Sequence, residues 1–134
     1  MKSTERASCT AIPAAAYDEQ FQELRGVFCA RLRSDRRRLA VLSAELARAE
    51  TNATPVYTDI RAMAHHLGGA AAVFEIPDVA ELAYSLEQAA RAAAIVHADN
   101  ADPAVWSALE SLVDLLNAMN GEMANGERYA QSAA

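Results

Sequence analysis

The segment TPVYTDIRAMAHHLGGAAAVF, residues 54–74, shows the pattern that the rest of the chain follows. Its apolar residues recur at steps of three and four, which is the period of an amphipathic α-helix with one buried face. Thr54 is a suitable cap, and Pro55 suits the first turn of a helix. The segment therefore predicts one helix whose inward positions are Ile60, Met63, Ala64, Leu67, Ala71 and Phe74.

Three other segments have the same period and predict helices over residues 17–49, 77–96 and 103–120. Asp102 is the expected cap of the last of these helices, and the Asn120-Gly121 pair is its expected end. Nothing in the chain has the alternation of a β-strand, and no internal repeat is present. We therefore expect an all-α, antiparallel up-down four-helix bundle.

The domain division that follows is a flexible leader at residues 1–13, the bundle at 14–120 and a flexible tail at 121–134. A chain of 134 residues fits one domain and can bury a core without disulfides or metals. Its Cys9 and Cys29 have no zinc-binding or redox spacing, so we expect two free thiols.

The net charge of −6 argues against a nucleic-acid partner, which requires a basic surface. No apolar run approaches the ~20 residues of a membrane span, and the first dozen residues lack the apolar centre of a signal peptide. We expect a cytoplasmic protein with no membrane partner. Because no fifth amphipathic surface is evident, we also expect a monomer.

Two adjacent histidines, at 65 and 66, and two adjacent glycines, at 68 and 69, lie inside the predicted 54–74 helix. On a helical wheel His65 falls roughly opposite the buried face, and His66 falls about a quarter turn from its centre. The residues around His65 on the wheel are mostly small: Thr58, Arg61, Ala62, Gly68, Gly69 and Ala72. The pattern thus predicts an imidazole that stands on a nearly bare helical surface.

Each glycine in a helix interior costs roughly 0.5–1 kcal/mol relative to alanine, so the pair needs a reason. One reason is that missing side chains let another protein approach the His65 ring. The other is tight packing between helices inside the domain. Both can apply, with Gly69 toward a neighbouring helix and Gly68 toward solvent.

The motif resembles the signature of histidine-containing phosphotransfer (HPt) domains, in which His-x-Leu-Lys-Gly is followed by small residues and later by a Leu-Glu pair. Residues 65–71 (HHLGGAA) fill the first part, and Leu86-Glu87 fills the second, with Glu87 22 positions after His65 (87 − 65). The resemblance implies that His65 accepts the phosphoryl group, that Glu87 orients its ring, and that Tyr84 lies near it. His66 fills a variable position of the motif.

The same resemblance implies that the chain is a phosphocarrier rather than an enzyme, and that it needs no cofactor of its own. Its partners would be a response-regulator receiver domain, which supplies Mg²⁺ and an acceptor aspartate, and a sensor or hybrid histidine kinase. The expected contact surface around His65 consists of Ala62, His66, Gly68, Gly69, Ala72 and Tyr84.

Two positions depart from the family pattern. Gly68 stands where the family usually has a lysine that helps to hold the phosphoryl charge, and Glu75 stands where a second glycine is common. We hypothesise that Arg61, one turn before His65, partly replaces the lysine. The alternative is an exposed arginine with no role.

Other functions remain open at this point. The missing lysine allows a non-phosphorylated helical adaptor that binds a receiver or kinase domain. A metal site built from the three histidines, including His97, is disfavoured because adjacent helical side chains diverge. The arginines at 36–38 favour a solvated face, with contact to an acidic receiver domain as the alternative.

Overall fold

The computed structural model describes residues 19–133, which form four α-helices and no strand. The helices are α1 (Glu19–Arg48), α2 (Thr54–Val73), α3 (Pro77–Ile95) and α4 (Pro103–Ala133). The expectation of an all-α four-helix bundle is confirmed. The predicted leader at residues 1–13 lies outside the described residues.

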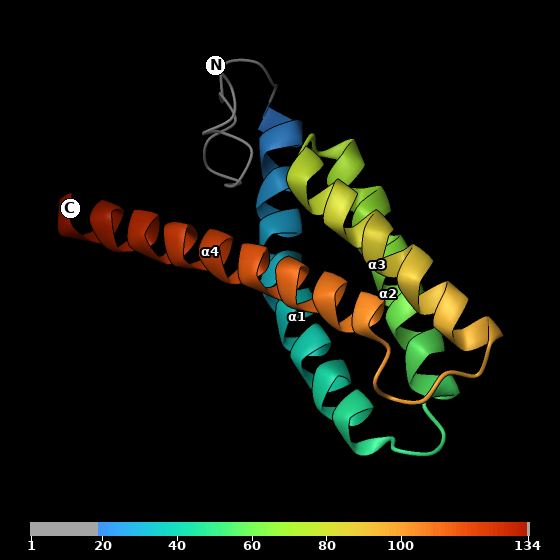
Figure 1. The fold of residues 1–134 in the computed structure, drawn as a ribbon. Helices are drawn as coiled ribbons and strands as arrows, with labels where there is room; N and C mark the ends of the chain where they lie inside the picture. The colour runs from blue at the N-terminus through green and yellow to red at the C-terminus, as the bar shows by residue number, and fades with distance from the viewer. Residues whose placement is uncertain (1–18, 134) are drawn as a thin grey trace.

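The helices are joined by short connections, so that neighbours in the chain are neighbours in space (Figure 1). α2 and α3 form a long antiparallel hairpin, α1 packs beside α2, and α4 crosses back over both α3 and α1. This order places the α2–α3 pair and the α1–α4 pair on opposite sides of the bundle.

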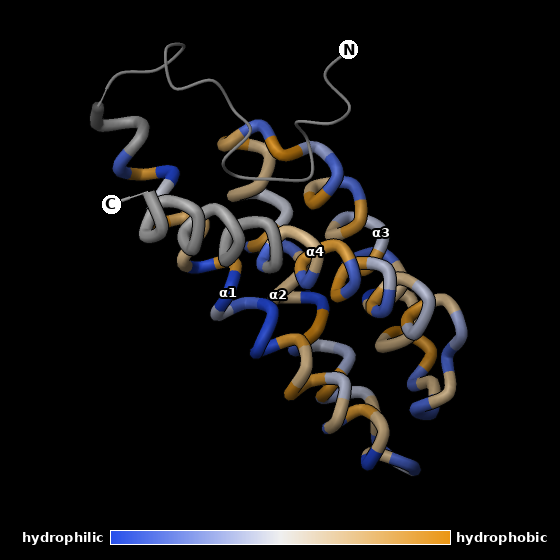
Figure 2. Tube along the Cα trace, turned by 90° about the vertical axis from the view of Figure 1, so that its left-hand side faces the viewer, coloured by the Kyte–Doolittle hydropathy of each residue, from blue (hydrophilic) through white to orange (hydrophobic). Residues whose placement is uncertain are grey.

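The core consists of apolar residues that recur along each helix at helical spacing (Figure 2). Tyr57 is the largest of the fully buried side chains, and its hydroxyl donates a hydrogen bond to the Asp99 carbonyl. Burial raises the pKa of this phenol. The buried residues of α2 and α3 are Tyr57, Ile60, Ala64, Leu67, Ala71, Val79, Ala83, Leu86, Ala90 and Ala93.

Two of the predicted caps can be compared with the structure. The Val105 amide donates to Asp102 Oδ1 at 3.1 Å, so the predicted cap of α4 is confirmed. The predicted cap at Thr54 is wrong, because Ala53 is the N-cap of α2 and makes no side-chain cap bond. The Thr54 hydroxyl instead lies 3.2 Å from Nδ1 of His97 and links the start of α2 to the end of α3.

The end of α2 has a backbone conformation at Glu75 that glycine adopts most readily. Glu75 has φ 58°, and the amide of Ile76 donates to the carbonyl of Ala71 at 2.9 Å. This is the left-handed helix ending in which glycine is usual because a Cβ is unfavourable there. The buried Ile76 side chain completes the ending and starts α3 in a fixed direction.

The predicted end of the fourth helix at Asn120 is wrong, because α4 continues to Ala133. A glycine lowers the stability of a helix by about 1 kcal/mol but does not by itself end it. The flexibility of the tail, and with it the domain division, stays a prediction.

Two expectations for α1 also need correction. Leu24, predicted to be inward, is 56% exposed. Phe28 stacks on Phe74 at the end of α2, with ring centroids 4.9 Å apart, so Leu24 lies one turn beyond the end of its neighbouring helix. Cys29 is disulfide-bonded rather than free, because pairing depends on distance in space and not on spacing in the chain. The free thiol predicted at Cys9 lies outside the described residues.

None of the helices among the described residues has the length and apolar character needed to span a membrane.

Candidate functional site

The two glycines of α2 have different surroundings, and the structure reverses their predicted roles. A Cβ at Gly68 would lie 3.3 Å from Cβ of Ala83 and 3.8 Å from the Ala80 carbonyl oxygen. A Cβ at Gly69 would have nothing within 4 Å. Gly68 therefore faces α3 and permits close packing, whereas Gly69 leaves open space on the outer surface.

This close packing brings the two residues of the predicted reactive pair together. Nδ1 of His65 on α2 lies 3.0 Å from Oε2 of Glu87 on α3. The His65 side chain is 68% exposed, whereas that of Glu87 is 18% exposed. The acid is thus partly enclosed between the helices, while the ring that it contacts projects into solvent.

A carboxylate beside Nδ1 has a defined effect on the imidazole. When Glu87 is ionised it can only accept a hydrogen bond, so Nδ1 carries the proton. Nε2 is then unprotonated, and its lone pair is free for nucleophilic attack or ligation. The arrangement leaves Nε2 of this histidine available for such chemistry.

The second histidine lies beside the first. The rings of His65 and His66 have centroids 5.8 Å apart and meet edge to face, and both side chains are exposed. The third histidine, His97, lies at the end of α3 beside Thr54. Within the described part of the chain no three His, Cys, Asp or Glu side chains could hold a metal ion.

The surface around His65 is made of small residues and one large aromatic residue. Ala62 and Ala72 are exposed on α2, one turn before His65 and two turns after it. Tyr84 is 63% exposed on α3, one turn before Glu87. These positions leave the ring accessible to another protein.

Two arginines lie one helical turn from the His65–Glu87 pair. Arg61 is exposed one turn before His65, and Arg91 is exposed one turn after Glu87. Because α2 and α3 are antiparallel, both guanidinium groups are at the same level of the hairpin. Our sequence interpretation considered Arg61 but missed Arg91, although its four-residue step from Glu87 places it on the same helical face.

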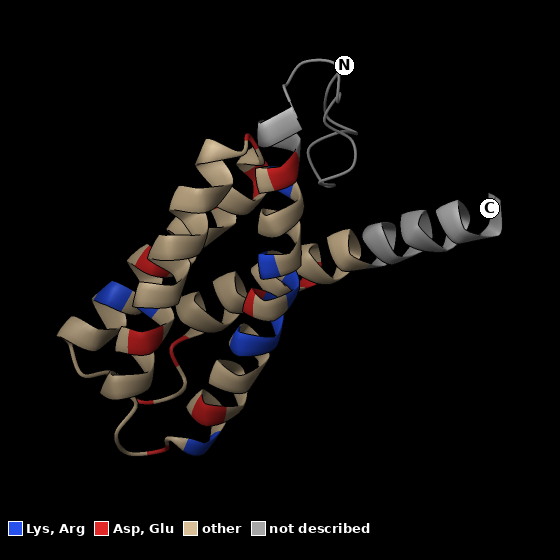
Figure 3. Cartoon of the chain, turned by 180° about the vertical axis from the view of Figure 1, so that it is seen from behind, with Lys and Arg blue, Asp and Glu red and all other residues tan. Residues whose placement is uncertain are grey.

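The other described arginines lie mainly on α1 (Figure 3). Arg36 donates to Oδ1 of Asn117 on α4 at 3.3 Å, so one member of the 36–38 run helps to join two helices. Arg37 and Arg38 are exposed, as expected of a solvated face. Arg31 lies 3.6 Å from Asp35, whose carboxyl has a pKa raised by burial, an effect that Arg31 opposes.

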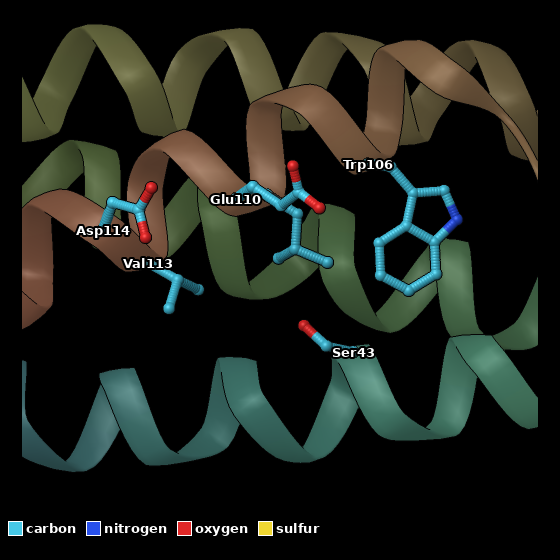
Figure 4. A pocket seen from close by; sticks show the side chains of 6 residues that line it. Ser43, Trp106, Glu110, Val113 and Asp114 are labelled. Atoms are coloured by element: carbon cyan, nitrogen blue, oxygen red, sulfur yellow. The ribbon is translucent and has the colours of Figure 1, made fainter.

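A shallow hollow of about 190 Å³ lies between α1 and α4 (Figure 4). Ser43 comes from α1, and Trp106, Leu109, Glu110, Val113 and Asp114 come from α4. The Ser43 hydroxyl donates to the Leu39 carbonyl, and the Trp106 indole donates to the Asn100 carbonyl. Both polar groups are thus engaged within the fold, and the hollow holds no histidine.

Comparison with protein-family models matches residues 23–123 to the Hpt domain. Comparisons with curated proteins and with solved structures give no match.

Proposed function

Because this chain belongs to the Hpt domain family, we propose that it carries a phosphoryl group on Nε2 of His65 within a two-component phosphorelay. Hpt domains are phosphocarrier modules that interact with receiver and kinase domains. The specific proposal is reversible exchange between His65 and the aspartate of a response-regulator receiver domain, with a sensor or hybrid histidine kinase as the original source.

The observation that carries this proposal is the 3.0 Å contact between Nδ1 of His65 and Oε2 of Glu87 beneath an exposed ring. Mere docking of a partner requires neither an unprotonated Nε2 nor an acid that fixes the tautomer. A nucleophile that accepts and returns a phosphoryl group benefits from both.

The step can be written without a proton leaving the ring. The Nε2 lone pair forms the N–P bond while the bond from phosphorus to the receiver's aspartate oxygen breaks, and its electron pair remains on that carboxylate. Nδ1 keeps its proton, so the ring becomes cationic and Glu87 stabilises it. In the reverse step the N–P electron pair returns to Nε2.

Apart from this pair and Arg61, the catalytic groups are assigned to the partner. Phosphoryl transfer depends mainly on alignment and on stabilisation of charge. The family resemblance implies that the receiver domain supplies Mg²⁺ and an acidic pocket. The family usually has a lysine at the position of Gly68. We assign Arg61 to partial replacement of that lysine, because the Arg61 side chain is exposed one turn from His65.

The contact surface for the receiver domain is proposed to be the outer face of the α2–α3 hairpin. Gly69 leaves open space beside the ring, and Ala62 and Ala72 present only methyl groups on either side. Gly68 supports this surface from below by letting α3 approach. Tyr84 provides an exposed aromatic side chain that a partner can cover.

The experiment is phosphorylation by a phosphorylated receiver or by a hybrid kinase that carries labelled phosphate. We expect label that is labile in acid and stable in base, present in the wild type and in His66→Gln but absent in His65→Gln. Loss of label only in His66→Gln would assign the wrong histidine to the reaction.

The adaptor remains the second candidate, because Gly68 stands where the family usually has lysine. It predicts that the protein binds a receiver or kinase domain without becoming labelled. Absence of label from the wild type with several cognate donors, together with measurable binding to one of them, would support the adaptor and overturn phosphotransfer.

A cytoplasmic location and a monomeric state are also part of the proposal. The cytoplasm keeps most protein thiols reduced, so Cys29 is expected to be reduced there despite its disulfide in the structure. Alkylation of free thiols in acid-quenched cells tests the location. An oxidised Cys29 in the cell would argue against it.

A further inference from the structure

The direction of the His65 ring determines where a phosphoryl group would be. The two nitrogens of an imidazole point in nearly opposite directions, and Nδ1 is directed toward Glu87 on α3. Nε2 is therefore directed outward and away from α3. A phosphoryl group on Nε2 would be separated from the Glu87 carboxylate by the width of the ring, and residues on the far side of His65 would lie closer to it.

His66 is on that far side. Gly68 faces α3, and two residues correspond to a rotation of about 200°, so His66 projects from nearly the opposite side of α2. The edge-to-face contact of the two rings, with centroids 5.8 Å apart, keeps the second imidazole next to the first. Both rings are exposed, so neither is confined by the core.

The helical neighbours of His66 provide no charged partner for it. The residues one turn before and one turn after it are uncharged: Ala62, Met63, Gly69 and Ala70. On α2 the nearest titratable and charged groups are His65, Arg61 and Asp59, and on α3 they are Glu87 and Arg91. α1 carries Arg31, Arg33, Asp35, Arg36, Arg37 and Arg38 at this level of the bundle, where the Phe28–Phe74 stack sets the register.

We infer that His66, when protonated, stabilises the phosphoryl group on Nε2 of its neighbour His65 and supplies the positive charge that Gly68 cannot. This inference rests on the proposed phosphotransfer function. It gives His66 a direct electrostatic role toward the phosphoryl group that depends on pH, because histidine is the side chain that normally changes charge between pH 5 and 8. Arg61 differs in being charged throughout that range.

The experiment measures the equilibrium constant for phosphoryl transfer from a phosphorylated receiver domain to the full chain, between about pH 5.5 and pH 8.5. Wild type, His66→Gln and His66→Arg are compared. The ratio of each constant to that of His66→Gln removes effects of pH that the variants share, including those on the receiver and on the N–P bond.

For the wild type we expect a ratio near one at about pH 8.5 that rises about two- to fivefold at about pH 5.5, the size expected for an exposed ion pair. For His66→Arg we expect a ratio of similar size at every pH. A wild-type ratio that stays at one, with His65 labelled in all variants, would overturn this inference and leave the proposed function intact. Failure of the wild type to become labelled would overturn both.

Discussion

The outer face of the α2–α3 hairpin and the face between α1 and α4 both carry carboxylates, but they use them differently. On the first face Glu87 is largely buried and contacts an exposed imidazole at 3.0 Å. On the second face Glu110 and Asp114 line a shallow hollow, and the neighbouring Trp106 indole is bonded within the fold. The two faces differ because only on the first does a neighbouring helix hold the carboxylate against an imidazole.

The difference between the two faces should be largest when one carboxylate on each face is replaced by alanine. Glu87→Ala leaves the His65 tautomer unselected, and we expect the rate of phosphoryl transfer to fall about 10- to 100-fold, as is usual when a partner that orients a functional histidine is lost. Glu110→Ala is the matched control and should transfer at the wild-type rate. Rapid-quench measurement with a phosphorylated receiver tests both, and equal rates for the two variants would remove Glu87 from the site.

The two glycines sharpen the comparison between the inner and outer surfaces of the same helix. Gly68→Leu must displace Ala83 and should lower the free energy of unfolding by about 1–3 kcal/mol, as overpacking does. Gly69→Leu has open space around its Cβ and should leave the stability equal or raised.

Urea denaturation measures both variants. Gly69→Leu should nevertheless weaken receiver binding, because its side chain covers the surface beside His65. Equal losses of stability in the two variants would contradict the assigned packing.

The arginines on α2 and α3 test whether positive charge one turn from the His65–Glu87 pair affects the rate of phosphoryl transfer. Arg61→Ala and Arg91→Ala should each slow transfer by about two- to fivefold without changing the thermal midpoint, because both side chains are exposed. The exposed Arg37 on α1 supplies the control, since Arg37→Ala is expected to have no effect on the rate. Unchanged rates in the first two variants would leave both arginines without a role.

The turn between α2 and α3 can be stabilised by a substitution away from the His65–Glu87 pair. Glu75 has φ 58°, so Glu75→Gly should raise the free energy of unfolding by about 0.5–1 kcal/mol. Calorimetry should show a thermal midpoint higher by a few degrees. The rate of transfer should not change, and a lower midpoint would indicate that the Glu75 side chain stabilises the turn.

Asp35 on α1 gives the smallest expected effect and the clearest dependence on pH. Burial raises the pKa of its carboxyl above the value of 3.8, so its ionised form is disfavoured in the folded protein. Its contribution to stability is present below about pH 3.8 and is lost as the pH rises through the folded pKa. Asp35→Asn should therefore be more stable than the wild type at pH 7 and equal to it in acid, as measured by urea denaturation at both pH values.

Local sequence determined a large part of the fold. The helical period identified four helices and most of the core, and Asp102 and Pro103 marked the start of α4 correctly. Predictions from local sequence failed where long-range packing competes with local preference. Leu24 is exposed because α2 has already ended beside it, and Thr54 contacts His97 rather than capping its own helix.

The candidate site divides in the same way. The sequence alone determined that His65 projects from a surface of small residues, because the angle between residues on one helix is fixed. Only the tertiary structure decided that Glu87 reaches Nδ1 of that ring, that Gly68 rather than Gly69 faces α3, and that Arg91 lies level with Arg61. Those relations depend on the rotation and register of one helix against another, which the packing of the whole core sets.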